Sequence, residues 1–333
     1  MEQKVTKDTK KGKQIIMWRN LRYRGEYLIF RLMLCVWQTL SPRGCARLAH
    51  KLAWLMCSVM PRKLTRYQVA HDNLRQAFGS EKTETEIDQI IHDMWVHLFR
   101  LLSEIAHLPR KLHLHNTHDV IQFRNRPDAV RALLSNRPVL LLSGHFGNWE
   151  MAISVFGLFG FQMGVVAREL DNPYLQNWFA RFRQQTGHQL IAKKNCFDDM
   201  LALLEQGGRF ALLGDQDAGR GGIFVEFFGK PASTLKTIAL LAQQYNALIC
   251  VGCSRRLPDR GEYWERFELA VEEVIDPQQL DTDNPILEIT QKYTAALERA
   301  VRRAPEQYFW LHKRWKTAPG DREARRLARK RAA

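Results

Sequence analysis

A chain of 333 residues with 45% hydrophobic and 26% charged residues can bury a sizeable core, which excludes an intrinsically disordered protein. Its formal net charge of +15 requires an anionic partner or surface, and nucleic acid, anionic lipid and an acidic protein all qualify. Six cysteines without a regular framework argue against a disulfide scaffold. Cys250 and Cys253 lie in an apolar run that we interpret as a buried strand, with redox or metal use as the lesser alternative.

Residues 1–26 form a strongly basic tail, and residues 27–62 contain two apolar segments. The first apolar segment, 27–40, is shorter than the roughly 20 residues of a spanning helix and contains Arg31. Both of its flanks are basic, so the positive-inside rule identifies no outside end. We predict amphipathic or re-entrant helices that lie in a cytoplasmic leaflet and anchor the chain to a membrane. A short single span and a buried helical hairpin are the alternatives.

Helical spacing of apolar residues continues over 64–108, and from residue 127 short strands alternate with helices. This alternation predicts an α/β fold with a central, largely parallel sheet flanked by helices on both faces. We expect residues 63–318 to form one domain, followed by a basic tail over 319–333. The expected strands are 139–143, 162–167, 209–213, 247–253 and 267–274, and the expected helices are 129–134, 151–159, 172–185, 197–205, 234–245 and 286–303.

The strongest local feature is residues 143–150, Ser-Gly-His-Phe-Gly-Asn-Trp-Glu, between a predicted strand and a predicted helix. Loops at the carboxyl ends of parallel strands are where α/β sheets place their sites. With His145 in the loop and Glu150 in the first helical turn, the carboxylate can hold one ring nitrogen. The other ring nitrogen would then act as a general base. A strand–turn–helix without any catalytic role fits the same spacing.

This segment resembles the H-x₄-[D/E] motif of glycerolipid acyltransferases. Over about residues 20–318 the chain resembles the lipid A biosynthesis acyltransferase family, the lauroyl and myristoyl transferases. The passages that carry the resemblance, besides 143–150, are Asp-Asn-Leu-Arg-Gln-Ala-Phe at 72–78, Val-Ala-Arg at 166–168, Gly-Asp-Gln-Asp at 214–217, Gly-Ile-Phe-Val-Glu-Phe-Phe-Gly at 222–229 and Pro-Glu-Gln-Tyr-Phe-Trp-Leu-His-Lys-Arg-Trp at 305–315.

The resemblance implies a glycerol-3-phosphate acyltransferase-like fold and an acyltransferase activity. The donor would be a thioester of acyl carrier protein or of coenzyme A, and the acceptor a hydroxyl of a glycolipid, a lipid A precursor. His145 would be the base and Glu150 would orient it. The implied location is the cytoplasmic face of the inner membrane, with an anionic membrane as partner, no nucleic acid, no metal and no cofactor.

Other functions remain open at this point. The same chemistry could serve another acceptor lipid, such as a phosphatidylinositol mannoside or an ornithine-type lipid, or water in a thioesterase. A non-enzymatic, basic membrane-binding protein is a further alternative, because charge runs are often membrane-facing.

By the resemblance, five further residues would bind substrate. Arg168 would bind a phosphate or a phosphopantetheine group through bidentate hydrogen bonds, unless it only forms a strand-end ion pair. Asp215 and Asp217 would bind sugar hydroxyls or orient Arg168, or they merely end a strand. Arg220 and Lys236 would add phosphate contacts. Seven aromatic residues are candidates for an acyl pocket, although core packing is the default for each: Phe146, Trp149, Phe156, Phe159, Phe224, Phe227 and Phe228.

Overall fold

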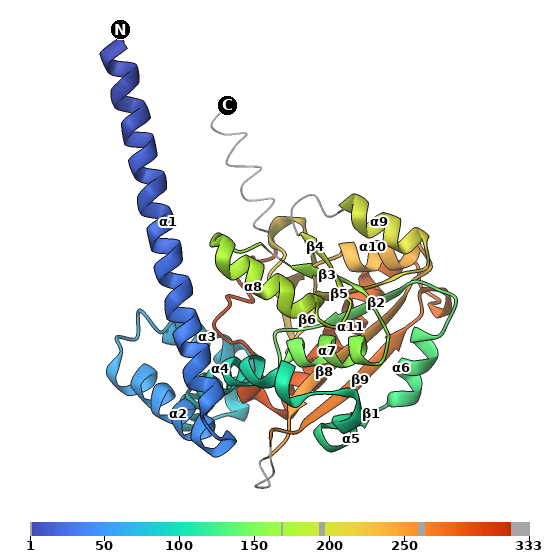
Figure 1. The fold of residues 1–333 in the computed structure, drawn as a ribbon. Helices are drawn as coiled ribbons and strands as arrows, with labels where there is room; N and C mark the ends of the chain where they lie inside the picture. Colours follow the sequence, from blue (N-terminus) through green and yellow to red (C-terminus); the bar gives the residue numbers. More distant parts are fainter. Residues whose placement is uncertain (1, 168, 193–196, 259–263, 321–333) are drawn as a thin grey trace.

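The computed structural model describes residues 2–167, 169–192, 197–258 and 264–320, and its centre is a seven-stranded sheet (Figure 1). The strands are β1 (Ile121–Arg124), β2 (Val139–Ser143), β3 (Gly164–Ala167), β4 (Gln189–Ala192), β5 (Arg209–Leu213), β8 (Leu248–Arg256) and β9 (Phe267–Ile275). Their order is β1-β9-β8-β2-β5-β3-β4, and the paired strands are parallel except for β8 and β9. The predicted α/β fold with a largely parallel sheet is confirmed.

Helices cover both faces of this sheet. On one face lie α6 (Arg126–Leu133), α7 (Trp149–Leu158) and α8 (Pro173–Gln184), and on the other lie α9 (Phe197–Glu205), α10 (Thr237–Gln244) and α11 (Pro285–Arg303). The packing of strand β2 explains why its residues are continuously apolar and do not alternate between apolar and polar. Its residues Leu140 and Leu142 pack with α10 and α11, whereas Val139 packs with α6 on the opposite face. Both faces are therefore buried, as a central parallel strand requires.

Four strands were not predicted from the sequence. The edge strands β1 and β4 have only four residues each, too few for a clear periodicity. Strands β6 (Ile223–Phe227) and β7 (Lys230–Thr234) form an antiparallel hairpin, so the helix predicted over 234–245 begins only at Thr237. Phe228 and Gly229 turn the hairpin with φ of 54° and 65°, the two positive values of a type I′ turn.

A helical layer precedes the sheet. It contains α2 (Pro42–Trp54), the π-helical turn η1 (Leu55–Val59), α3 (Tyr67–Phe78), α4 (Glu84–Lys111) and the short α5 (Thr117–Val120). Helix α4 begins with a capping box between Thr83 and Glu86. The remaining short 3₁₀ segments are η2 (Gly79–Glu81), η3 (Leu114–Asn116), η4 (Gly219–Gly221), η5 (Pro277–Gln279) and η6 (Pro305–Gln307).

Helix α1 (Glu2–Thr39) runs without a break through the predicted basic tail and the first apolar segment, and its first turns extend away from the body (Figure 1). Leu34 and Trp37 are buried in a cluster with α2 and α4, and the ring of Phe30 packs edge-on against Trp178 of α8. Among the described residues, no helix combines the length and the apolar character needed to cross a bilayer. Most of the predicted tail at 319–333, residues 321–333, lies outside the described residues.

Candidate active site

His145 and Asp215 meet at the carboxyl ends of two neighbouring strands. Ser143 of β2 is paired with Leu213 of β5, so His145 and Asp215 each lie two residues beyond the same point of the register. Nδ1 of His145 is 2.8 Å from Oδ1 of Asp215, and the backbone N–H of His145 donates to Oδ2 at 2.9 Å. One carboxylate therefore fixes both the ring and the backbone of His145.

The electrostatic environment keeps Asp215 ionised. Its side chain is only 3% exposed, and this burial would raise its pKa. The charge of His145 and the hydrogen bonds that His145 donates outweigh burial, so the pKa of Asp215 lies below its ordinary value. Tyr308 lies next to Asp215, and burial, followed by the Asp215 charge, raises the pKa of its hydroxyl. The side chain of His145 is 23% exposed, so its ring contacts the buried Asp215 carboxylate and is also accessible to solvent.

The predicted pairing of His145 with Glu150 is corrected by this geometry, because the carboxylate at Nδ1 is that of Asp215. Glu150 lies in the first turn of α7 and accepts from Arg183 of α8, with Nε 3.0 Å from Oε2 and Nη2 2.5 Å from Oε1. Burial opposes the charge of Arg183, but its pair with Glu150 raises the pKa above the ordinary value. The spacing H-x₄-E thus brings both residues to one pocket while giving their polar groups different partners.

The loop from His145 to Asn148 is held by backbone hydrogen bonds to two distant segments. The N–H of Gly147 donates to the carbonyl of Gln307 at 2.9 Å, and that of Asn148 donates to Ser254 at 2.7 Å. The carbonyl of His145 accepts from the N–H of Phe309 at 2.9 Å. The closing Pro-Glu-Gln-Tyr passage therefore fixes the backbone of this loop.

Gly147 is essential to this close approach. Its φ is +60°, and a Cβ at this position would lie 1.8 Å from the carbonyl oxygen of Ser254. We expect Gly147→Ala to lower the thermal unfolding midpoint by many degrees, because the strand β8 backbone cannot move away. Gly160→Ala is the matched control: its φ is +82°, but no atom lies within 4 Å of the added Cβ. Equal midpoints for the two variants would contradict the proposed contact.

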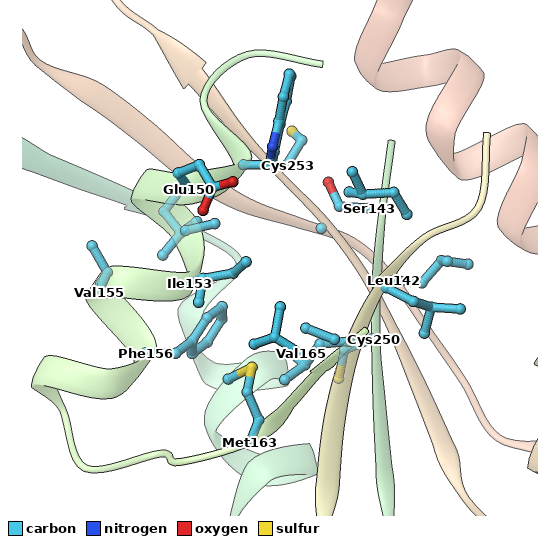
Figure 2. Close-up of a pocket in the computed structure, with 18 of the residues that line it drawn as sticks. Leu142, Ser143, Glu150, Ile153, Val155, Phe156, Met163, Val165, Cys250 and Cys253 are labelled. Carbon is cyan, nitrogen blue, oxygen red and sulfur yellow. The ribbon is translucent and has the colours of Figure 1, made fainter. Parts of the chain in front are cut away.

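His145, Glu150 and Arg183 line one cavity of about 750 Å³ between α7 and the sheet. Most other lining side chains are apolar and come from α6, α7, β2, β3, β5 and β8. In Figure 2, Glu150 and Met163 lie at opposite ends of the labelled lining, with Ile153, Phe156 and Val165 between them. A largely apolar cavity that also presents polar groups, among them those of His145, Glu150 and Arg183, suits a molecule with a polar head and a hydrocarbon tail.

The other predicted substrate-binding residues are placed differently. Arg168 lies outside the described residues. The carboxylate of Asp217 accepts from the backbone N–H of Gly219 and from the N–H and hydroxyl of Thr317, so it joins two loops. Arg220 and Lys236 are exposed, in η4 and just before α10. None of the three residues Asp217, Arg220 and Lys236 is among the described residues that line the cavity.

The predicted aromatic residues divide into two groups. Trp149, Phe156 and Phe159 line the cavity. Phe146, Phe227 and Phe228 belong instead to a buried core cluster with α3, α4 and the 304–311 segment, and Phe224 does not belong to the described lining either. Cys250 and Cys253 are buried in β8 with free thiols, as the buried-strand interpretation predicted. Burial raises the pKa of Cys250 to about 12, so this thiol is inert at neutral pH.

Two charged residues of the site were missed. Arg183 carries no local motif, and only the fold brings it to Glu150. Glu104 of α4 is 1% exposed and contacts the loop through Asn148. A signal for Glu104 existed, because it is a carboxylate on the apolar side of a helix, between Leu101 and Leu108. Among the described residues, no group of three His, Cys, Asp or Glu side chains is placed to hold a metal ion.

The fold and this site define an α/β protein in which a His–carboxylate pair lies at one end of an apolar cavity. A sequence profile of the bacterial lipid A biosynthesis acyltransferases matches residues 13–317, and the chain belongs to that family.

Three similar proteins illustrate the relationship. The chain is 28% identical over 185 residues to the lipid A biosynthesis lauroyltransferase of Escherichia coli, a match covering 55% of this chain and 58% of the relative. It is 28% identical over 193 residues to the palmitoleoyltransferase of that organism, covering 57% and 59%. A lipid A biosynthesis acyltransferase of Haemophilus influenzae is 25% identical over 304 residues, covering 88% and 89%. The chain thus spans under two thirds of the two Escherichia coli relatives.

Proposed function

We propose that this protein transfers an acyl group from a thioester to a hydroxyl group of a glycolipid. The observation that carries the proposal is the hydrogen bond between Nδ1 of His145 and Asp215 at one end of the apolar cavity. Asp215 then holds the ring as the tautomer with hydrogen on Nδ1, and Nε2 is the atom that accepts a proton. Membership of a family of acyltransferases supports the same reaction.

The proposed reaction has two steps. Nε2 of His145 takes the proton of the lipid hydroxyl while the hydroxyl oxygen attacks the thioester carbonyl, which forms a C–O bond and a tetrahedral intermediate. The intermediate then breaks its C–S bond, and the imidazolium returns the proton to the departing sulfur. The products are one ester and one free thiol, and His145 is regenerated. Asp215 stabilises the imidazolium between the two steps.

The cavity is proposed to hold the acyl chain, with Met163 at its far end. Met163→Ala should lengthen the cavity and shift the preference toward donors with longer chains, because one methylene in a fitted pocket changes discrimination by about 1–3 kcal/mol. A mixture of donors of different length, analysed by mass spectrometry of the product, measures this preference independently of enzyme concentration. Met200→Ala, a buried methionine of α9 that is not part of the cavity lining among the described residues, is the control. An unchanged preference in Met163→Ala would contradict the assignment.

The proposed acceptor is a lipid A precursor. The relatives are named for lipid A biosynthesis, and a phosphorylated glycolipid would be attracted to a chain with a net charge of +15. The same charge favours an acidic acyl carrier protein as donor, with acyl coenzyme A as the second candidate. We propose that the reaction takes place on the cytoplasmic face of the inner membrane, where such thioesters are available.

We propose that the exposed apolar face of α1 binds the membrane. Leu28, Ile29 and Leu32 are 66%, 71% and 67% exposed, and they lie opposite the residues that pack on the body. The cavity lining extends close to this helix, since Leu170 lines the cavity and, two residues further on, the amide of Asn172 donates to the carbonyl of Tyr23 in α1. A surface helix of this kind enters the headgroup region of an anionic leaflet without spanning it.

Replacing Leu28, Ile29 and Leu32 together with serine should weaken binding to vesicles that contain anionic lipid by at least roughly tenfold, because burying each such side chain contributes about 1.5–3 kcal/mol. Flotation with vesicles measures the bound fraction. Leu134→Ser, which changes a leucine that is 66% exposed at the end of α6, should bind as the unchanged protein does. Equal binding by the triple variant would contradict an interfacial role for α1.

The function itself is tested with purified protein, an acyl carrier protein thioester or acyl coenzyme A, and a phosphorylated glucosamine disaccharide lipid that bears free hydroxyls. Mass spectrometry should detect the acceptor with one added acyl group. A phosphatidylinositol mannoside and an ornithine-type lipid, supplied in parallel, identify a different acceptor. Binding to vesicles without product from any donor and acceptor would contradict the proposed activity.

A further inference from the structure

A buried polar cluster lies behind the His145 loop and takes no part in the reaction described above. It contains Glu104, His97, Asn148 and Arg256, which are 1%, 2%, 0% and 7% exposed. Buried charges and amides in such a place are costly unless each finds a partner. The hydrogen-bond partners of these four residues therefore indicate the role of the cluster.

Glu104 uses one oxygen for each of two donors. Its Oε1 accepts from Nε of Arg256 in β8, and its Oε2 accepts from Nδ2 of Asn148 at 2.8 Å. The Arg256 backbone is held in turn by the side-chain amide of Gln307, through bonds of 2.8 and 3.0 Å. A second ion pair, between Arg100 and Glu265, lies on the same side. Glu104 thus links α4, β8 and the loop that carries His145.

The link to Asn148 has a direction. Burial raises the pKa of Glu104, but the Arg256 guanidinium that donates to Oε1 favours the ionised carboxylate. An ionised carboxylate can only accept hydrogen bonds, so Glu104 requires the NH₂ group of the Asn148 amide to face it. The amide oxygen then points the other way, and it accepts from the backbone N–H of Met151 at 2.9 Å. This bond is the N-cap of α7, the helix whose first turn carries Glu150. The orientation of one amide therefore fixes where α7 begins relative to His145.

We propose that Glu104 is a positioning residue: by orienting the Asn148 amide, it holds the His145 loop and the first turn of α7 in the geometry for acyl transfer. This inference rests on the proposed function. Glu104 would act through Asn148, which lies in the His145 loop, and would touch neither substrate.

A cycle of three variants tests the direction of the hydrogen bond. In Glu104→Gln, a glutamine that still accepts from Arg256 turns its NH₂ group toward the NH₂ group of Asn148, so the Asn148 amide must flip and the cap on Met151 is lost. In Asn148→Asp, two carboxylates face each other. In the double variant, the introduced glutamine donates to the introduced aspartate while that aspartate still caps α7, so the bond returns with its polarity reversed. Glu205→Gln, at an exposed glutamate of α9, is the matched control.

We expect Glu104→Gln and Asn148→Asp each to lower kcat for acyl transfer at least tenfold, with KM for the thioester within about twofold of the unchanged protein. The double variant should recover kcat to within about threefold. Recovery of this kind separates a positioning role from a merely structural one, because two independent structural losses would multiply. If Glu104→Gln does not fold, the comparison of Asn148→Asp with the double variant carries the same test.

An unchanged kcat in a folded Glu104→Gln, or a double variant as poor as the product of the single losses, would overturn the inference. If Glu104→Gln does not fold, a double variant no better than Asn148→Asp would also overturn it. The thermal unfolding midpoints of the same cycle report the Glu104–Asn148 contact without any substrate. If the unchanged protein transfers no acyl group, the proposed function fails, and non-additive midpoints still show whether Glu104 orients Asn148.

Discussion

His145→Ala should lower kcat for acyl transfer by about 10²- to 10⁴-fold, the usual contribution of a positioned general base. The loss should fall on kcat, because the apolar cavity that is proposed to bind the acyl chain is unchanged. Initial rates over a range of thioester concentrations measure kcat and KM separately.

The control is His118→Ala, since 76% of the side chain of His118 is exposed. It should retain the activity of the unchanged protein. Transfer by His145→Ala at a normal rate, with a normal thermal unfolding midpoint, would reject the role of His145.

Asp215→Asn should lower kcat by up to about 10⁴-fold, because an amide at this position can favour the wrong tautomer of the histidine it holds.

Double-variant cycles distinguish the roles of the two carboxylates of the site, Asp215 and Glu150. Asp215→Asn should add little to His145→Ala, because both changes remove the same base. Glu150→Gln should be non-additive with Arg183→Gln, because Glu150 and Arg183 form one buried ion pair. Initial rates of all single and double variants measure these couplings.

The opposite pattern would contradict the geometry. If Glu150→Gln added nothing to His145→Ala while Asp215→Asn lowered the rate further, Glu150 would be the orienting carboxylate. The pairing predicted from the sequence would then hold during the reaction.

Much of the fold followed from the sequence because its central strands are buried on both faces. The strands predicted over 139–143 and 209–213 have the bounds of β2 and β5, since each is an apolar run between turn residues. The four-residue edge strands and the β6–β7 hairpin were not predicted, because none of these strands contains a run of four apolar residues such as those of β2 and β5. Family resemblance identified the motifs around the site but could not reveal their contacts.

The site was only partly predictable for a physical reason. His145 and Glu150 are close in sequence, and that closeness favoured pairing them. Asp215 is 70 residues away from His145, and only the parallel register of β2 and β5 brings the two together. The partner of Glu150, Arg183, comes from a helix whose docking on α7 no local pattern encodes. The family resemblance had made the carboxylate at position 215 a candidate, but as one that binds substrate, orients Arg168 or merely ends a strand.

The most direct test of acyl transfer by this protein compares thiol release with ester formation in one reaction. A radiolabelled thioester, the glycolipid acceptor and the purified protein are mixed, and free thiol and labelled lipid are measured over the same time course. The proposed mechanism predicts one ester for each thiol, with little thiol released when the acceptor is omitted. Thiol released at the same rate without acceptor, and no labelled lipid, would show that water and not a lipid hydroxyl is the nucleophile.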